Sequence, residues 1–274
     1  MDTRRGFIEV DDGRLEALWC GPGPEQAPTL VFLHHGLGCV DTWRDFPAEL
    51  ARATGFGALV YSREGYGGSD ACALPRPPTY MHAEALEVLP RVLEATEIRE
   101  CVLVGHSDGG SIALVYAGGT PAPTVRGLIT EAAHIFLEDI SVRGIEQARR
   151  DFTEGKLREA LERHHGANTD CAFHGWCDGW LQPAFRDFDL EEYLPAVRVP
   201  WLVIQGEDDA YGTLAQVESI VKGADGPTET LILEGCGHDP HREQPEVVLE
   251  RMARFVRALP RRGAADQSSS GSTR

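Results

Sequence analysis

Gly105-His106-Ser107-Asp108-Gly109 decides how this chain is interpreted, because it stands between the apolar run 101–104 and a small-residue stretch that continues through residue 117. The pattern predicts a strand, a sharp turn and a helix, with serine at the turn. Glycines two positions before and after the serine permit a strained backbone and close packing of strand against helix. A bare glycine-rich strand–helix connection is the alternative, and the flanking strand and helix signals weigh against it. Ser107 is therefore a candidate nucleophile.

Length, composition and charge limit the class of protein. The chain has 274 residues, of which 42% are hydrophobic, enough for one large domain with an insertion or for two smaller ones. A formal net charge of −17 disfavours nucleic acid and anionic membranes as partners. No stretch approaches the roughly twenty apolar residues of a membrane span, and no apolar core of a signal peptide follows the start. We therefore expect a cytoplasmic protein, which is a monomer or a homodimer.

The seven cysteines give a second indication of compartment. They are odd in number and have no repeated spacing. This distribution favours free thiols in a reducing compartment over a disulfide framework.

Short apolar runs alternate with helical patterns along most of the chain. Residues 6–10 and 15–19 flank an Asp-Gly step and predict an antiparallel hairpin. Six further runs have the character of strands buried on both faces: 29–33, 57–61, 101–104, 125–130, 201–204 and 230–233. Helical spacing covers 80–96 and 245–259. The alternation predicts an α/β fold with a mainly parallel sheet covered by helices.

One segment, 137–195, lacks strand signals and predicts a helical insertion into a core made of 1–136 and 196–260. It contains amphipathic patterns followed by an aromatic-rich passage that includes Trp176 and Trp180. An insertion at the carboxyl ends of parallel strands would cover a ligand site, so we expect these two tryptophans to line a substrate pocket. Alternatively the aromatic residues pack only against one another. Residues 261–274 contain no large apolar side chain, and we expect a flexible tail.

A nucleophilic serine needs a base, and the base needs a carboxylate to orient it. Glu207, Asp208 and Asp209 follow the predicted strand 201–204, and His238 follows the strand 230–233. Both groups thus fall at the edge of the sheet where Ser107 is expected. Its position after a strand favours His238 as the base among the ten histidines. Glu207, Asp208 and Asp209 remain alternatives for the carboxylate that orients it.

The motifs together resemble the α/β-hydrolase superfamily over nearly the whole chain up to residue 259. The segments that carry the resemblance are Gly105-His106-Ser107-Asp108-Gly109, His34-His35-Gly36-Leu37-Gly38, Ser62-Arg63-Glu64-Gly65-Tyr66-Gly67-Gly68-Ser69-Asp70, Gly206-Glu207-Asp208-Asp209 and Gly235-Cys236-Gly237-His238. The resemblance implies a mostly parallel eight-stranded sheet, a helical cap, and a nucleophile, acid and histidine in that chain order: Ser107, Asp209 and His238. The family's acid usually stands three residues after a glycine, which selects Asp209.

The same resemblance implies an oxyanion hole made by the backbone N–H groups of Leu37 and Asp108. Gly36 and His134 are then expected beside the substrate, although His134 could simply terminate its strand. The side chain of Asp108 could stabilise the helix N-terminus, or it could attract an ammonium group or hydrogen-bond donor of the substrate.

A metal site is not expected. His34 next to His35 suggests one, and so does the spacing of Cys171, His174 and Cys177, but no further ligand is spaced to complete either set.

The sequence therefore predicts a cofactor-independent serine hydrolase that acts on a small-molecule carboxylic ester. Carbon–carbon, lactone, thioester and amide bonds remain alternatives, because a fold does not determine its substrate. Epoxide hydrolases and haloalkane dehalogenases of this family are disfavoured, since they have aspartate where this chain has Ser107. A non-catalytic binding protein of the same fold is the alternative of a different class, and a complete set of three catalytic residue types weighs against it.

Overall fold

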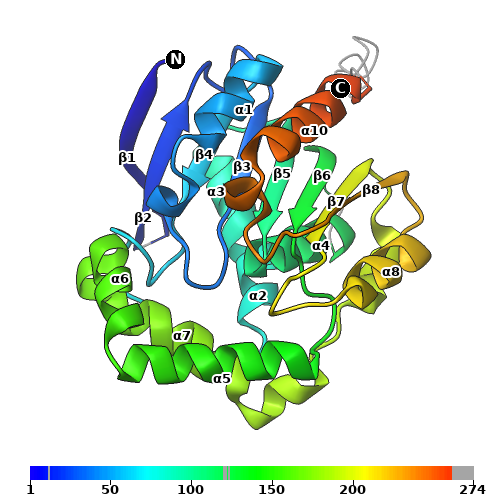
Figure 1. Ribbon diagram of the computed structural model, residues 1–274. Coiled ribbons are helices and arrows are strands. Elements are labelled where there is room, and N and C mark those ends of the chain that lie inside the picture. Colours follow the sequence, from blue (N-terminus) through cyan, green and yellow to red (C-terminus); the bar gives the residue numbers. More distant parts are fainter. Residues whose placement is uncertain (12, 120–121, 123, 261–274) are drawn as a thin grey trace, which may run out of the picture.

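The computed structural model describes residues 1–11, 13–119, 122 and 124–260 (Figure 1). The tail expected at 261–274 lies outside the described residues. Within the described part of the chain, no helix combines the length and apolar character that a membrane span requires.

An eight-stranded sheet forms the centre of the fold. Its strands follow one another in space as β1-β2-β4-β3-β5-β6-β7-β8. Only β2 runs against the others, since its pairings with β1 and β4 are antiparallel and the remaining pairings are parallel. The strands are β1 (Thr3–Val10), β2 (Gly13–Cys20), β3 (Thr29–Leu33), β4 (Gly57–Tyr61), β5 (Cys101–His106), β6 (Val125–Glu131), β7 (Trp201–Gly206) and β8 (Thr228–Leu233). The predicted mostly parallel sheet is confirmed.

Two hydrophobic layers, one on each face of the sheet, explain the continuous apolar runs. Along β3, Leu30 and Phe32 belong to one layer, whereas Val31 and Leu33 belong to the other. Alternate side chains of a strand point to opposite faces, so a strand covered on both sides needs apolar residues at every position. The helices that cover the two faces are α1 (Phe46–Thr54), α3 (Leu89–Ala95), α4 (Asp108–Gly119), α8 (Leu214–Gly223) and α10 (Pro245–Ala258). Helices α1 and α10 pack on one face, and α3, α4 and α8 on the other (Figure 1).

The helix predicted over 80–96 is divided into three parts. An α-helical turn α2 (Tyr80–Ala83) and α3 are joined by the π-type segment η2 (Glu84–Val88). Pro90 lacks the amide hydrogen that would bond to the carbonyl four residues earlier, and the irregular segment lies directly before it. The helical spacing over 80–96 was correctly predicted, and Pro90 accounts for the π-type interruption.

A group of helices lies beyond the carboxyl ends of the parallel strands (Figure 1). It comprises α5 (Asp139–Thr153), α6 (Lys156–His165), η3 (Gly166–Asn168), α7 (Thr169–Leu181), η4 (Pro183–Asp187) and η5 (Glu191–Ala196). We call residues 139–196 the cap segment. The segments before and after most of these helices lie side by side. Leu190 N–H donates to Ile135 O at 2.7 Å, and Phe136 forms an isolated β-bridge with Asp189. The division into core and insertion proposed from the sequence remains a prediction.

Candidate active site

The turn between β5 and α4 holds Ser107 in a left-handed conformation with φ of 54°. The flanking glycines have no room for side chains. A Cβ on Gly105 would lie 2.3 Å from Gly109 O, and a Cβ on Gly109 would lie 2.0 Å from Leu33 O. Ser107 N–H donates to Glu131 O at 2.8 Å, which fixes the turn against β6. The two glycines are thus required by close approach of backbone to backbone.

Ser107, His238 and Asp209 form a continuous chain of hydrogen bonds. Ser107 Oγ lies 3.0 Å from His238 Nε2, and His238 Nδ1 lies 2.8 Å and 2.9 Å from the two carboxylate oxygens of Asp209. The carboxylate can only accept, so Nδ1 carries the hydrogen and Nε2 is left to accept from the serine hydroxyl. This is the tautomer that a general base needs.

The surroundings of Asp209 keep its carboxylate ionised. Gln205 Nε2 and Tyr211 N–H donate to it at 2.7 Å and 2.8 Å. Burial works toward a higher pKa of Asp209, but His238 and the Tyr211 N–H outweigh it and hold the pKa below its usual range. Burial likewise opposes protonation of His238, and Asp209 outweighs that effect and raises the pKa of His238.

Among the three neighbouring carboxylates, geometry favours Asp209. Asp209 is buried and contacts His238, whereas Glu207 and Asp208 are exposed.

The predicted oxyanion donors both line the pocket above Ser107. Asp108 is the first residue of α4, where amide groups have no intrahelical partner. Leu37 N–H makes a 3.3 Å contact with His35 Nδ1. Arg63, which is fully buried, donates to the carbonyls of His34 and His35 and so holds the loop that contains Leu37.

A cap histidine supports the same loop. His165 Nδ1 accepts from Gly67 N–H at 3.0 Å, and its Nε2 donates to Leu37 O at 3.1 Å. Burial lowers the pKa of His165 to about 4, so the ring stays neutral with one nitrogen as donor and one as acceptor. The sequence pattern gave no indication of this contact, because the partners His165 and Leu37 are 128 positions apart.

The carboxylate of Asp108 has partners that neither of its expected roles included. It accepts from Tyr80 Oη at 2.5 Å and from Trp180 Nε1 at 3.2 Å, and Asp108 is fully buried. Burial raises the pKa of Asp108, against the opposing effect of Arg63 and the two donors. The carboxylate therefore ties the residue after Ser107 to the cap helix α7 and to α2. Tyr80 lies inside a predicted helix and belongs to no motif, so sequence reasoning missed it.

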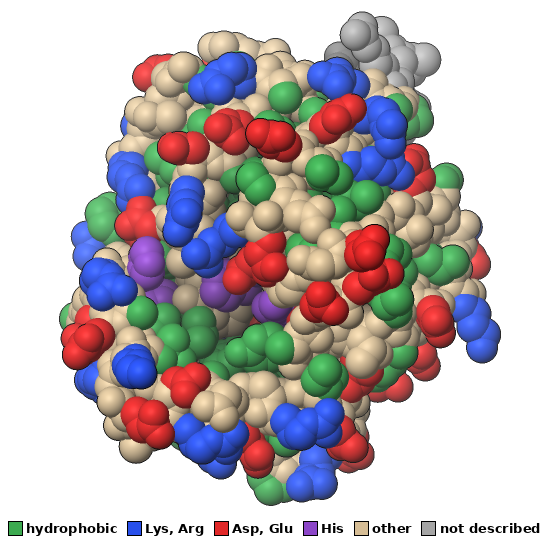
Figure 2. All heavy atoms as spheres, in the orientation of Figure 1, with side chains coloured by type: hydrophobic (Ala, Val, Ile, Leu, Met, Phe, Trp, Pro, Cys, Tyr) green, Lys and Arg blue, Asp and Glu red, His purple; other side chains and the backbone are tan. Residues whose placement is uncertain are grey.

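A pocket of about 500 Å³ opens in front of Ser107 and contains all four predicted substrate contacts, Gly36, His134, Trp176 and Trp180. Trp176 and Trp180 are four residues apart on α7 and thus share a helix face. Gly36 packs against the first of them, since a Cβ there would lie 2.1 Å from Trp176 Cδ1. Figure 2 shows a hollow with hydrophobic side chains in its interior and histidines at its edge.

His134 is buried beside this pocket, with its ring 5.1 Å from that of Trp180 and 5.9 Å from that of His238. Burial lowers the pKa of His134 to about 4. Within the described residues its Nδ1 is buried and has no hydrogen-bond partner.

Several atoms that could bind a metal already have hydrogen-bond partners. Both ring nitrogens of His34 make hydrogen bonds, to His35 O at 2.7 Å and from Arg63 N–H at 3.0 Å. His35, His106 and Asp239 offer ligand atoms within 4.8 Å of one another. Nε2 of His106 already lies 2.6 Å from the carbonyl of His238, so binding a metal through that atom would disturb the backbone of the proposed base.

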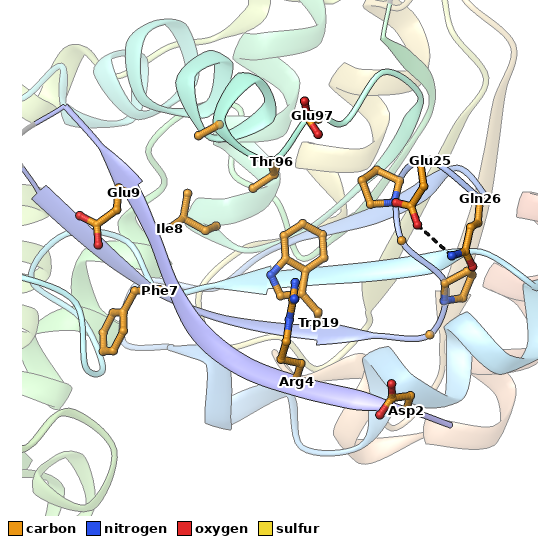
Figure 3. A pocket seen from close by; sticks show the side chains of 15 residues that line it. Asp2, Arg4, Phe7, Ile8, Glu9, Trp19, Glu25, Gln26, Thr96 and Glu97 are labelled. Atoms are coloured by element: carbon orange, nitrogen blue, oxygen red, sulfur yellow. Dashed lines mark hydrogen bonds between the residues drawn. The ribbon is translucent and has the colours of Figure 1, made fainter.

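A larger pocket, of about 1000 Å³, lies at the opposite end of the sheet (Figure 3). It is bounded by residues 21–26 and 95–97, which precede β3 and β5 and hence mark the amino ends of the parallel strands. Its described lining includes several carboxylates and Trp19, but no serine, histidine or cysteine. Ligands of α/β sheets bind at the carboxyl ends, so the smaller pocket at Ser107 is the candidate active site.

Comparison with known proteins defines the class. The model of the alpha/beta hydrolase family matches residues 30–251, and the chain belongs to this family. It is 26% identical over 270 residues to the 2-succinyl-6-hydroxy-2,4-cyclohexadiene-1-carboxylate synthase of Salmonella agona, covering 86% of this chain and 96% of the relative.

Solved structures share the fold at lower sequence identity. VinJ has a TM-score of 0.74 at 23% identity and covers 94% of this chain and 99% of its own. The esterase of Exiguobacterium antarcticum has a TM-score of 0.71 at 20% identity and covers 93% of this chain and all of its own.

Proposed function

We propose that the protein is a cofactor-independent serine hydrolase that cleaves a carboxylic ester through an acyl-enzyme on Ser107. The observation that carries this proposal is the continuous hydrogen-bond chain from Ser107 through His238 to the buried Asp209, at the base of a pocket. A protein that only binds a ligand has no physical need for an oriented base.

In the proposed reaction, Ser107 Oγ attacks the ester carbonyl while His238 Nε2 takes its proton. Asp209 keeps the imidazole oriented and stabilises the imidazolium. The N–H groups of Leu37 and Asp108 stabilise the negative oxygen of the tetrahedral intermediate, and loss of one such donor typically costs about 100- to 1000-fold in rate. His238 then protonates the leaving alcohol, and a water molecule activated by the same histidine releases the acid.

The lining of the pocket supports a medium-sized, partly apolar acyl group. Trp176 and Trp180 form one wall, and the cap adds the aliphatic side chains of Ile145, Leu157 and Leu161. His134 lines the same pocket with a ring that burial keeps neutral.

The test is hydrolysis of a p-nitrophenyl ester series of increasing acyl length by the wild type and by Ser107→Ala. We expect turnover that the substitution abolishes, with a length optimum set by the pocket. Activity of Ser107→Ala equal to that of the wild type would contradict the proposed mechanism.

A second candidate function is favoured by the arginines of the pocket. Arg44, Arg163 and Arg242 line it although the chain carries a net charge of −17. Among the described residues, neither Arg44 nor Arg163 has a carboxylate within 4.0 Å, whereas Arg242 lies 3.9 Å from Asp239. Unpaired guanidinium groups at a pocket favour a substrate that carries a carboxylate.

The arginines at the pocket fit the name of the Salmonella relative, which is a synthase of a succinyl-substituted carboxylate. The second candidate is therefore a lyase in which Ser107, with His238, takes a proton from carbon instead of forming an acyl-enzyme. The electrons of the C–H bond then form a double bond as a leaving group departs from the adjacent carbon. Mass spectrometry of rapidly quenched turnover distinguishes the two. An acyl adduct on Ser107 indicates the hydrolase, and Ser107-dependent turnover without an adduct indicates the lyase.

A further inference from the structure

Cys72 and Cys171 lie in contact at the junction between the cap segment and the core. Their Sγ atoms are 2.7 Å apart, about 0.7 Å longer than a disulfide bond. Cys72 belongs to the loop between β4 and α2, and Cys171 belongs to the first turn of α7. We propose that these two thiols form a reversible disulfide in the folded protein, with a low-molecular-weight disulfide as the oxidant.

Exposure separates this pair from the other cysteines. Cys72 and Cys171 are partly exposed, whereas the other five cysteines are buried. A small oxidant can therefore reach this pair and not the remaining thiols, and the reaction is expected to be selective.

The surrounding contacts hold the two sulfur atoms in place before any bond forms. Gly65 packs against both, since a Cβ there would lie 2.6 Å from the sulfur of Cys72 and 2.8 Å from that of Cys171. Asn168, which precedes α7, donates to Gly67 O at 3.1 Å and to Ser69 O at 2.6 Å, so it fixes the same loop to the same helix. The fold thus brings together two thiols that are 99 positions apart without help from the bond itself.

The chemistry proceeds by thiol–disulfide exchange. A thiolate of the pair attacks oxidised glutathione, forms a mixed disulfide and releases one glutathione thiol; the second cysteine then displaces the other glutathione. In sum, two protein thiols and one glutathione disulfide give one protein disulfide and two glutathione thiols. Burial raises the pKa of Cys72 to about 11, so the attack is faster at mildly alkaline pH.

The bond would act on the helix that forms one wall of the pocket. Trp176 and Trp180 lie about one and a half and two and a half turns beyond Cys171 on α7. A covalent link at the first turn of α7 prevents this helix from separating from the loop after β4. Oxidation therefore fixes the position of the cap segment, and reduction releases this constraint.

The experiment is equilibration of the intact protein with glutathione redox buffers at pH 8, followed by alkylation and mass mapping of non-reduced peptides. We expect a cross-linked pair of peptides containing Cys72 and Cys171, lighter by two hydrogens and restored to thiols by dithiothreitol. In urea the same equilibrium constant should fall on the order of 1000-fold, because closing a ring of about 100 residues is then opposed by chain entropy. Free thiols, or mixed glutathione disulfides without a cross-link, at every ratio of oxidised to reduced glutathione would overturn the proposal.

Variants add a second readout. Oxidised wild type should melt at a higher temperature than reduced wild type, and Cys72→Ser should show no such difference. Cys177→Ala, on the same helix but at a buried cysteine, serves as the control and should retain the cross-link. A cross-link that survives in Cys72→Ser would assign the bond to other cysteines and would also overturn the proposal.

Discussion

The state of a single histidine governs the proposed chemistry. His238 must be neutral to accept the proton of Ser107, and Asp209 raises its pKa by favouring the charged form. We therefore expect activity to fall on the acid side at a pH above the ordinary imidazole pKa of about 6.5. In Asp209→Asn the strongest influence that raises the pKa of His238 is lost, and burial is opposed only by the more weakly acting Asp239 and Asp108. The acid limb should therefore move to lower pH, while kcat falls by about 10⁴-fold through loss of the correct tautomer.

The measurement is kcat/KM against pH for both proteins. Asp208→Asn is the matched control, because its carboxylate is exposed and adjacent in sequence. An unchanged acid limb in Asp209→Asn would show that the titrating group is not the His238–Asp209 pair.

The side chain of Asp108 gives a different prediction from the one that its sequence position suggested. A carboxylate facing an ammonium-bearing substrate would make Asp108→Asn selectively harmful to cationic esters. Because the carboxylate instead accepts from Tyr80 and Trp180, an amide leaves one donor facing another donor, which costs about 1–3 kcal/mol. We expect equal losses of kcat/KM on neutral and cationic esters, with a lower melting temperature.

Tyr80→Phe removes one of the two donors and should reproduce part of this effect. A loss of kcat/KM confined to cationic esters would instead indicate that Asp108 contacts the substrate directly.

Motif residues and supporting residues differ in how far the sequence predicts them. Ser107 directly follows β5, whereas Asp209 and His238 stand three and five residues after the ends of β7 and β8. Local pattern therefore predicted all three at one edge of the sheet, and the family resemblance selected Asp209 from its neighbours. Tyr80 and His165 act through contacts with residues 28 and 128 positions away, and nothing in their local sequence marks those contacts. Their roles arise only when the cap segment packs on the core.

At the scale of elements, α7 packs on the loop after β3 through a glycine. A Cβ at Gly36 would overlap the indole ring of Trp176. Gly36→Ala is therefore expected to displace α7 or the Leu37 loop, at a cost of about 1–3 kcal/mol in stability, and to lower kcat/KM. Trp176→Ala in the same chain should relieve the overlap, so the double variant is more stable than the sum of the two single losses predicts.

The measurement is thermal unfolding and ester kinetics of the wild type, the two single variants and the double variant. Gly6→Ala is the control for the glycine substitution itself, because no atom lies within 4 Å of a Cβ built there. Strictly additive losses would mean that Gly36 and Trp176 do not determine how α7 packs.

The elements themselves were largely predictable, for a physical reason. Strands buried on both faces, such as β3, need apolar residues at consecutive positions, and turn residues bound them. The helix over 80–96 kept its predicted period but not its continuity, since Pro90 interrupts the hydrogen bonding. Residues 139–196 form helices, but their packing on Gly36 and Asp108 depends on individual side chains, which helical spacing does not specify.

At the scale of the whole molecule, buried neutral histidines make the fold sensitive to acid. Burial lowers the pKa of His106, His134 and His165 to about 4, below the unfolded value of about 6.5. The unfolded chain therefore binds more protons between these values. The stability that the neutral rings contribute is complete above pH 6.5 and is lost as the pH falls toward 4. Each such histidine adds at most about 1.4 kcal/mol per pH unit to the slope of the unfolding free energy.

His165 allows this argument to be tested at one position. Glutamine can accept from Gly67 N–H and donate to Leu37 O as the imidazole does, but it does not titrate. His165→Gln should therefore flatten the fall of the unfolding free energy between pH 6.5 and 4, measured by urea unfolding, while the exposed neighbour His164→Gln should leave it unchanged. Equal slopes for His165→Gln and the wild type would mean that the link between α6 and the Leu37 loop does not depend on a neutral ring. A flatter slope, together with better retention of ester hydrolysis after exposure to acid, would show that this one side chain couples the cap segment to the Leu37 loop.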